Sequence, residues 1–168
     1  PLESRNFVED YGNYLLDCLY KYNPSTDFSN LNIVIDTANG ASSNTSSYIF
    51  SKLGCKYHII NNKPNGTNIN NNCGSMHPEG LRQYILENKL DGGVLYDGDA
   101  DRAIFIDEEG NIIDGDYVLA IIGTDLKKKN KLHNNTIVGT VMNNLGFINY
   151  CKDNNINFIP TKVGDRYV

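Results

Sequence analysis

The sequence lacks any excess of basic residues. It carries 15 Lys and Arg against 20 Asp and Glu in 168 residues, a formal net charge of -5, and has no long basic run. Because nucleic-acid binding needs a basic face that neutralises phosphates, this balance argues against a nucleic-acid partner. The one basic cluster, KKKNK at 127–131, follows a predicted helix, where cations complement the helix dipole and usually face solvent.

Closely spaced cysteines are also missing. The four cysteines include no Cys-x-x-Cys pair, so neither a zinc knuckle nor a disulfide framework is indicated. No stretch of about 18 apolar residues occurs, and the amino terminus lacks the basic-then-apolar order of a signal peptide. We therefore expect reduced thiols and a soluble, cytoplasmic protein without a membrane partner.

Neither end has the features of a natural terminus. The chain begins with Pro1 instead of Met, and it ends at Val168 inside an apolar-charged run. Domains usually have about 100 to 150 residues, so the length fits one complete domain and a remainder. We expect an internal piece of a larger protein.

Apolar periodicity predicts helices and strands in alternation. Spacing of three and four residues predicts an amphipathic helix over 7–22, and Asn39-Gly40 then turns a strand into a helix that stops at Gly54. Residues 61–72 form a long, Asn-rich polar loop, and Pro78 is placed to begin the next helix. The predicted strands are 31–36, 57–60, 93–96, 103–106 and 112–113.

A second unit of the same kind begins near Asp114. We predict a helix through Val118 and Leu126, a strand over 136–141, a helix through Leu145, and a strand near 158–159. The predicted fold class is therefore α/β, with a layered mixed sheet flanked by helices and an incomplete second α/β unit. We place the complete domain at residues 1–112 and the incomplete one at 114–168.

An acidic loop directly follows the predicted strand 93–96. Asp97, Asp99 and Asp101 alternate with small residues that let the backbone curl, which could bring all three carboxylates onto one hard cation. Oxygen ligands favour magnesium or calcium over zinc. Arg102 adds a guanidinium fork that suits a bidentate grip on phosphate. A metal beside an Arg indicates phosphoryl chemistry.

Three other interpretations of this loop are possible. A calcium EF-hand would gain Glu108 at its twelfth position, but its sixth position holds Arg102 instead of Gly, and strands flank the loop where helices belong. A phosphatase of the aspartyl-nucleophile type would use Asp97 as the nucleophile, although Asp101 replaces the usual Thr or Val. An exposed Asp-Gly turn between strands would leave three clustered acids unexplained.

Five segments carry a resemblance to a known family: VIDTANGA at 34–41, NINNNCGSMHPE at 68–79, DGDADR at 97–102, GTVMNNLG at 139–146 and TKVGDRYV at 161–168. Together they resemble the α-D-phosphohexomutases, and within these the bacterial phosphoglucosamine mutases. The acidic loop is typical of the whole superfamily. The segments at 68–79 and 162–168 are similar to the glucosamine branch.

The resemblance implies an isomerase that moves phosphate between the 6- and 1-positions of glucosamine, through a phosphoserine enzyme and a bisphosphorylated sugar, for cell-wall precursor synthesis. It implies Mg²⁺ as the cofactor, held by Asp97, Asp99 and Asp101 on the second of four domains, and a catalytic Arg102 close to the phosphoserine. It also implies that a third-domain loop contacts the phosphorylated amino sugar through Lys162, Gly164, Asp165 and Arg166.

The resemblance also implies parts that this chain does not contain. No Ser-His-Asn-Pro loop of the phosphoserine type occurs, and a Glu-x-Ser sugar-reading loop would lie beyond Val168. The expected partners are therefore the missing domains 1 and 4 of the same enzyme, and we expect the fragment alone to be inactive. The alternatives are a fragment of a phosphomannomutase or phosphoglucomutase, and a stand-alone Mg²⁺-binding or interaction module without catalysis.

Overall fold

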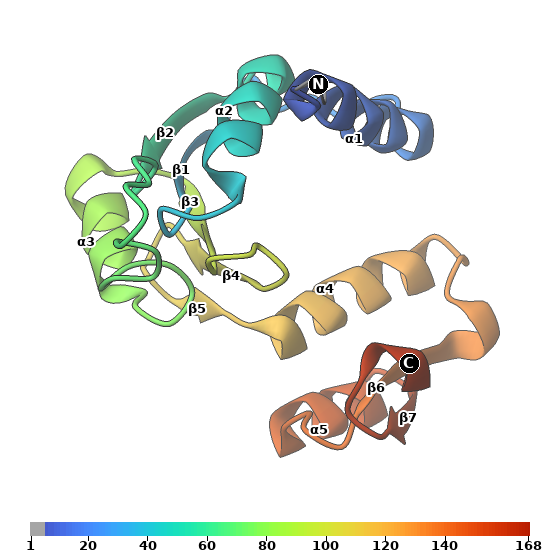
Figure 1. Cartoon of the computed structure of the whole chain (residues 1–168). Helices are drawn as coiled ribbons and strands as arrows, with labels where there is room; N and C mark the ends of the chain where they lie inside the picture. The colour runs from blue at the N-terminus through green and yellow to red at the C-terminus, as the bar shows by residue number, and fades with distance from the viewer. Residues whose placement is uncertain (1–5) are drawn as a thin grey trace, which may run out of the picture. The chain divides into compact units, whose positions relative to one another are not determined.

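The computed structural model describes residues 6–168, with Asp165 described by its backbone alone. The chain divides into two compact units, Pro1–Ile112 and Ile113–Val168 (Figure 1). Within residues 6–168, no helix combines the length and the apolar character needed to cross a membrane. The four cysteines are free.

The first unit is built on a mixed sheet of five strands in the order β2-β1-β3-β4-β5. β1 pairs in parallel with both β2 and β3, whereas β3 pairs antiparallel with β4. The strands are β1 (Asn32–Asp36), β2 (Lys56–Ile60), β3 (Gly92–Tyr96), β4 (Ala103–Asp107) and β5 (Ile112–Ile113). The helices are α1 (Val8–Tyr22), α2 (Ser42–Leu53) and α3 (Glu79–Asn88). The predicted layered mixed sheet flanked by helices is confirmed.

Helices cover both faces of the parallel part of this sheet. The chain moves from β1 through α2 to β2, and then through α3 back across β1 to β3, so right-handed crossovers place the two helices on opposite sides (Figure 1). In such sheets, ligand sites lie at the carboxyl ends of the strands where this direction reverses, here between β1 and β3. The acidic loop leaves the carboxyl end of β3.

One apolar cluster holds α3 on the sheet. Apolar side chains from β1, α3, the turn after α3, β3 and β4 meet there, and each is almost fully buried: Val34, Leu81, Ile85, Leu90, Leu95 and Ile106. Burial of a Leu or Ile side chain contributes about 1.5–3 kcal/mol relative to exposure, so this cluster anchors the strand that leads into the acidic loop.

Two helix ends show how local sequence sets the boundaries. α2 ends at Leu53, and Gly54 takes the left-handed C-cap conformation at φ 79° that stops the helix, as predicted. α3 begins at Glu79, with Pro78 as its N-cap, one residue later than predicted. Pro78 already has helical φ and ψ of -72° and -12°, so its fixed ring prepares the turn that Glu79 continues.

The second unit has two parallel strands and two α-helices. They are β6 (Thr136–Thr140), β7 (Asn157–Thr161), α4 (Gly115–Lys128) and α5 (Leu145–Asp153), with short 3-10 turns η1 (His133–Asn135) and η2 (Asp165–Tyr167). Its core consists of four buried residues, Ile137, Phe147, Cys151 and Ile156. Asp114 accepts hydrogen bonds from the amides of Asp116 and Tyr117, and this N-cap explains where α4 begins.

The prediction that the basic cluster faces solvent is wrong for Lys127. Its Nζ donates to the carbonyl oxygens of Asn154 and Asn155, at 2.5 and 2.9 Å. Asn154 is the C-cap of α5, so the Lys127 cation complements the dipole of α5 in addition to that of its own helix. Lys129 behaves as a surface charge and pairs with Asp125 at 2.7 Å.

Candidate metal centre

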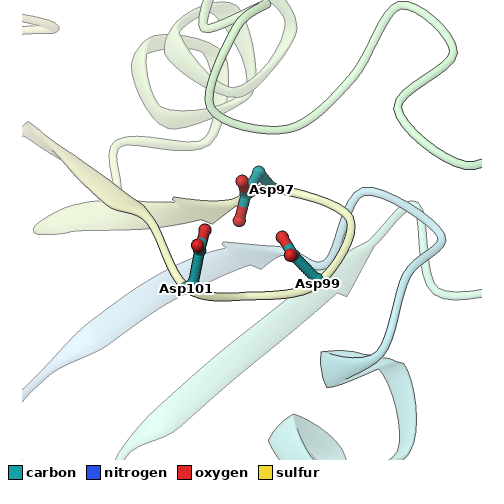
Figure 2. A group of neighbouring side chains, drawn as sticks. All are labelled: Asp97, Asp99 and Asp101. Carbon is teal, nitrogen blue, oxygen red and sulfur yellow. The ribbon is translucent and has the colours of Figure 1, made fainter.

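The acidic loop connects β3 to β4 and brings the three predicted ligands together (Figure 2). Asp97 is buried, with 2% of its surface exposed, whereas Asp99 and Asp101 are exposed. One oxygen from each carboxylate lies within 4.8 Å of the other two. Figure 2 shows the three side chains pointing toward the inside of the loop.

A reversal of the backbone produces this convergence. Ala100 has a φ of 62°, in the left-handed region that residues other than glycine rarely adopt. The amide of Ala100 donates to the carbonyl of Asp97 at 3.1 Å, and the amide of Asp97 donates to the carbonyl of Arg102 at 3.3 Å. The run of alternating acids is thereby closed into a loop. In an extended strand, neighbouring side chains on one face would stay about 7 Å apart.

The donor set fits a hard divalent cation. Oxygens on one face of an octahedral Mg²⁺ lie about 3 Å apart, given metal–oxygen distances of about 2.0–2.1 Å. Asp99 and Asp101 are exposed, so a change of rotamer at these two side chains would let the spacing contract around an ion. Three carboxylates and no nitrogen or sulfur ligand suit magnesium or calcium better than zinc.

Arg102 is bonded to the buried member of the triad. Its Nε donates to Oδ2 of Asp97 at 2.7 Å, and its backbone amide donates to Oδ1 at 3.2 Å. Burial acts to raise the pKa of Asp97, but the hydrogen bonds and the charge of Arg102 outweigh it and leave this pKa below its ordinary value. Arg102 therefore keeps Asp97 ionised and able to act as a ligand.

Repulsion acts on Asp101. The negative charge of Asp99 raises the pKa of Asp101 above its ordinary value, and some loss of solvation and the charge of Asp97 add to this effect. Arg102 lies 3.7 Å from Asp101, and its charge acts in the opposite direction. One guanidinium thus faces a group of three carboxylates, which leaves an excess of negative charge that suits a divalent cation.

The predicted sugar-binding residues lie in the second unit, after β7. Lys162 and Arg166 both lie over the ring of Tyr167, with Nζ at 5.9 Å and Cζ at 4.9 Å from the ring centroid. Gly164 has a φ of 129°, which turns the chain so that it passes this ring. The structure therefore gathers the two cations at one exposed aromatic side chain. The side chain of Asp165 lies outside the described residues.

Sequence reasoning missed a buried carboxylate near the acidic loop. Asp36 ends β1 with 1% of its surface exposed, and it accepts hydrogen bonds from the amide of Ala38, the side chain of Asn61 and the amide of Gly74. A signal was available, because an Asp at the end of an apolar strand needs several donors to be buried there. The sequence did not show that two of these donors come from a distant loop.

Comparisons with protein families agree with the two units. Residues 9–110 match the model described as phosphoglucomutase/phosphomannomutase, alpha/beta/alpha domain II. Residues 114–168 match the corresponding model for domain III. These two matches cover nearly all of the described chain.

Curated relatives are identical to this chain at about half of the aligned positions. The chain is 54% identical over 142 residues to the phosphoglucosamine mutase of Clostridium botulinum, a match that covers 84% of this chain and 32% of that protein. It is 47% identical over 167 residues to the phosphoglucosamine mutase of Acetivibrio thermocellus, covering 99% of this chain and 36% of that protein. The chain thus spans about a third of the length of these relatives.

Solved structures share the fold at low sequence identity. A phosphoglucomutase/phosphomannomutase family protein from Burkholderia thailandensis matches with a TM-score of 0.74 and 18% identity, over 96% of this chain and 34% of that one. An N-acetylglucosamine-phosphate mutase in a substrate complex matches with a TM-score of 0.72 and 20% identity, over 94% and 33%. From its two domain matches, the chain belongs to the phosphoglucomutase/phosphomannomutase family, the α-D-phosphohexomutases.

Proposed function

We propose that the chain is part of a phosphoglucosamine mutase. Such an enzyme interconverts glucosamine 6-phosphate and glucosamine 1-phosphate through a phosphoserine enzyme and a bisphosphorylated sugar. The 54% identity to the Clostridium botulinum protein of that name supports the amino sugar over a hexose. The observation that carries the contribution of this chain is the convergence of three carboxylate oxygens within 4.8 Å.

In this proposal the first unit supplies the Mg²⁺ site of the mutase. Asp97, Asp99 and Asp101 hold the cation, and the bond from Arg102 keeps Asp97 ionised. When bound, Mg²⁺ supplies positive charge that offsets the charge of a transferring phosphoryl group. The domain division that we propose is 1–112 for domain II and 114–168 for the start of domain III, and the two compact units support it.

Arg102 acts as the catalytic residue of this chain. Its Nε is engaged by Asp97, whereas 65% of its side-chain surface is exposed. The terminal guanidinium nitrogens can therefore grip a phosphate oxygen while Nε keeps the side chain oriented. This geometry supports a role next to the phosphoserine of the first domain.

The loop after β7 binds the sugar phosphate in the same proposal. Lys162 and Arg166 supply two exposed cations, and the ring of Tyr167 holds them near each other. Gly164 and Asp165 shape the same loop. The nucleophilic serine and the Glu-x-Ser loop come from other parts of the enzyme, so we propose that the chain alone does not turn over sugar phosphates.

Calorimetry of Mg²⁺ binding tests the metal site directly. We expect the 168-residue chain to bind Mg²⁺ and the Asp99→Asn variant to bind it much more weakly, because one of three charges facing the cation is lost. Asp125→Asn removes the same charge from an exposed ion pair on α4 and is the matched control. Equal affinity in the parent and in Asp99→Asn would contradict the metal assignment.

A chimera tests the reaction. The chain replaces its aligned third of the Clostridium botulinum phosphoglucosamine mutase, and turnover of glucosamine 6-phosphate is compared with that of mannose 6-phosphate. We expect a chimera that prefers the amino sugar and loses activity with Asp99→Asn. A folded chimera that turns over neither substrate would contradict the proposed function, and a preference for mannose 6-phosphate would favour a phosphomannomutase.

A further inference from the structure

The buried carboxylate of Asp36 joins three segments of the first unit. Oδ1 accepts from the amide of Ala38 at 2.8 Å, in the turn that follows β1. Oδ2 accepts from Nδ2 of Asn61 at 2.9 Å, just after β2, and from the amide of Gly74 at 3.0 Å, in the long loop that connects β2 to α3 over residues 61–78. All three donors are neutral, so the carboxylate acts as a multiple acceptor and not as half of an ion pair.

The long loop that Asp36 holds contacts the strand leading into the acidic loop. The amide of Ser75, next to Gly74, donates to the carbonyl of Tyr96 at 3.0 Å. A side chain at Gly74 would meet the same carbonyl at 2.6 Å, so glycine permits this close approach. Tyr96 immediately precedes Asp97. A shift of Gly74 would therefore move Tyr96 through the Ser75–Tyr96 hydrogen bond, and with it Asp97, the first of the three carboxylates.

The turn that Asp36 holds contacts the acidic loop itself. The amide of Ala41 donates to the carbonyl of Gly98 at 2.8 Å. A Cβ at Gly40 would lie only 2.2 Å from that oxygen, so the two backbones are in direct contact. Gly98 lies between Asp97 and Asp99, and the turn therefore supports the segment that carries two of the three carboxylates.

A further bond connects the two supports to each other. The amide of Asn70 donates to the carbonyl of Ala38 at 2.9 Å, and a Cβ at Gly98 would lie 2.7 Å from Nδ2 of Asn70. The acidic loop is thus enclosed by the turn after β1 and by the long loop. The Asp36 carboxylate bonds to both of these supports.

We propose that Asp36, which is not one of the three carboxylates of the cation site, is a positioning residue for that site. This inference rests on the proposed Mg²⁺ site. Mg²⁺ demands near-ideal octahedral geometry, whereas Ca²⁺ accepts more ligands in flexible arrangements. A rigid acidic loop therefore favours Mg²⁺ over Ca²⁺, and loosening the loop lowers Mg²⁺ affinity more than Ca²⁺ affinity.

The test compares Asp36→Asn with Asp107→Asn in the 168-residue chain. Asn at position 36 keeps the size of the side chain, but its NH₂ group cannot accept hydrogen bonds, so either the amide of Ala38 or the two donors from Asn61 and Gly74 lose their acceptor. Asp107 also accepts three hydrogen bonds, from the amides of Glu109 and Asn111 and from Nδ2 of Asn111. It pairs with Gly92, at the end of β3 away from the acidic loop, and is therefore the matched control.

Two measurements are made on each variant. Calorimetry with MgCl₂ and with CaCl₂ gives the ratio of the two affinities, and hydrogen exchange of residues 97–102 in metal-free protein reports the loop directly. For Asp36→Asn we expect Mg²⁺ affinity to fall at least about tenfold, as for other groups that orient metal ligands, with a smaller fall for Ca²⁺. Exchange in the loop should become several-fold faster. Asp107→Asn should change neither the affinity ratio nor this exchange.

Asn61→Gly is the milder variant if Asp36→Asn does not fold. It removes one donor to Asp36, and glycine readily adopts the φ of 50° found at Asn61. We expect the same changes as in Asp36→Asn, reduced in size.

Two results would overturn the inference. One is unchanged loop exchange together with an unchanged affinity ratio. The other is an equal fall for both cations that follows a lower folded fraction by circular dichroism, since this would show a role in folding alone. A parent chain that binds neither cation would contradict the proposed Mg²⁺ site, while the exchange measurement would still show whether Asp36 positions the loop.

Discussion

Arg102 donates from Nε to Oδ2 of Asp97 at 2.7 Å, so a mostly exposed guanidinium is bonded to a carboxylate that is almost completely buried. This hydrogen bond orients the side chains of both Asp97 and Arg102 in the acidic loop. Asp97 stays charged in spite of its burial, and the remaining guanidinium nitrogens of Arg102 stay available for an anionic group.

Replacing Arg102 by Lys should raise the pKa of Asp97. Lysine keeps the positive charge, but it has a methylene group where arginine has the Nε–H group that donates to the Asp97 carboxylate. Carbon-detected NMR titration of metal-free protein measures this pKa, with Arg82→Lys on the exposed side of α3 as the control. An unchanged Asp97 pKa in Arg102→Lys would show that the bond is not its cause.

Stability should depend on pH through the same carboxyl group. The pKa of Asp97 is lower in the folded protein than its ordinary value of about 3.9. The contribution of the ionised Asp97 to the free energy of unfolding is therefore complete at pH values above the ordinary pKa. It is lost as the pH falls through the lower pKa of the folded state. Urea midpoints from pH 2 to 7 should fall less steeply with acid in Asp97→Asn than in the parent. Parallel curves would contradict this prediction.

Leu81→Ala should destabilise the first unit by about 2–5 kcal/mol, because a fully buried side chain of the α3–sheet cluster is truncated and leaves a cavity. Leu86 lies on the same helix with 46% of its surface exposed, so Leu86→Ala should cost no more than about 0.5 kcal/mol. Chemical denaturation gives both values. Similar losses in the two variants would show that α3 does not pack on the sheet through Leu81.

Gly40→Ala should weaken Mg²⁺ binding and lower the melting temperature. The added methyl group would lie 2.2 Å from the carbonyl oxygen of Gly98, and neither backbone can move without displacing the acidic loop. At Gly80, in α3, an added methyl group meets no atom within 4 Å. Gly80→Ala should therefore be neutral or stabilising by up to about 1 kcal/mol. Calorimetry and thermal melts compare the pair, and equal behaviour would exclude the close contact.

Lys127→Met should destabilise the second unit by about 1 kcal/mol, because two carbonyl oxygens beyond α5 lose their cationic donor while the apolar stem is kept. Lys128→Met, the neighbouring change of equal charge, is the control. Urea denaturation followed by the NMR signals of residues in the second unit measures the difference. No difference between the variants would mean that the Lys127 bonds are not maintained in solution.

Much of the candidate site could be predicted because its signals are local. Asp97, Asp99 and Asp101 are neighbours in the chain, and their spacing after an apolar strand predicts convergence on a cation. Gly54 and Asp114 mark helix ends through the conformation or hydrogen bonding of a single residue. The behaviour of Lys127 could not be predicted, because its acceptors lie 27 and 28 residues away.

The sequence by itself determined the order of helices and strands, the position of the acidic loop and the family, since each depends on patterns within a few consecutive residues. Only the tertiary structure decided which segments support that loop. Asp36 reaches Gly74 across 38 residues, and Gly40 meets Gly98 only because β1 and β3 are paired in parallel. Such contacts arise from strand pairing and shared packing, for which the local order of residues carries no signal.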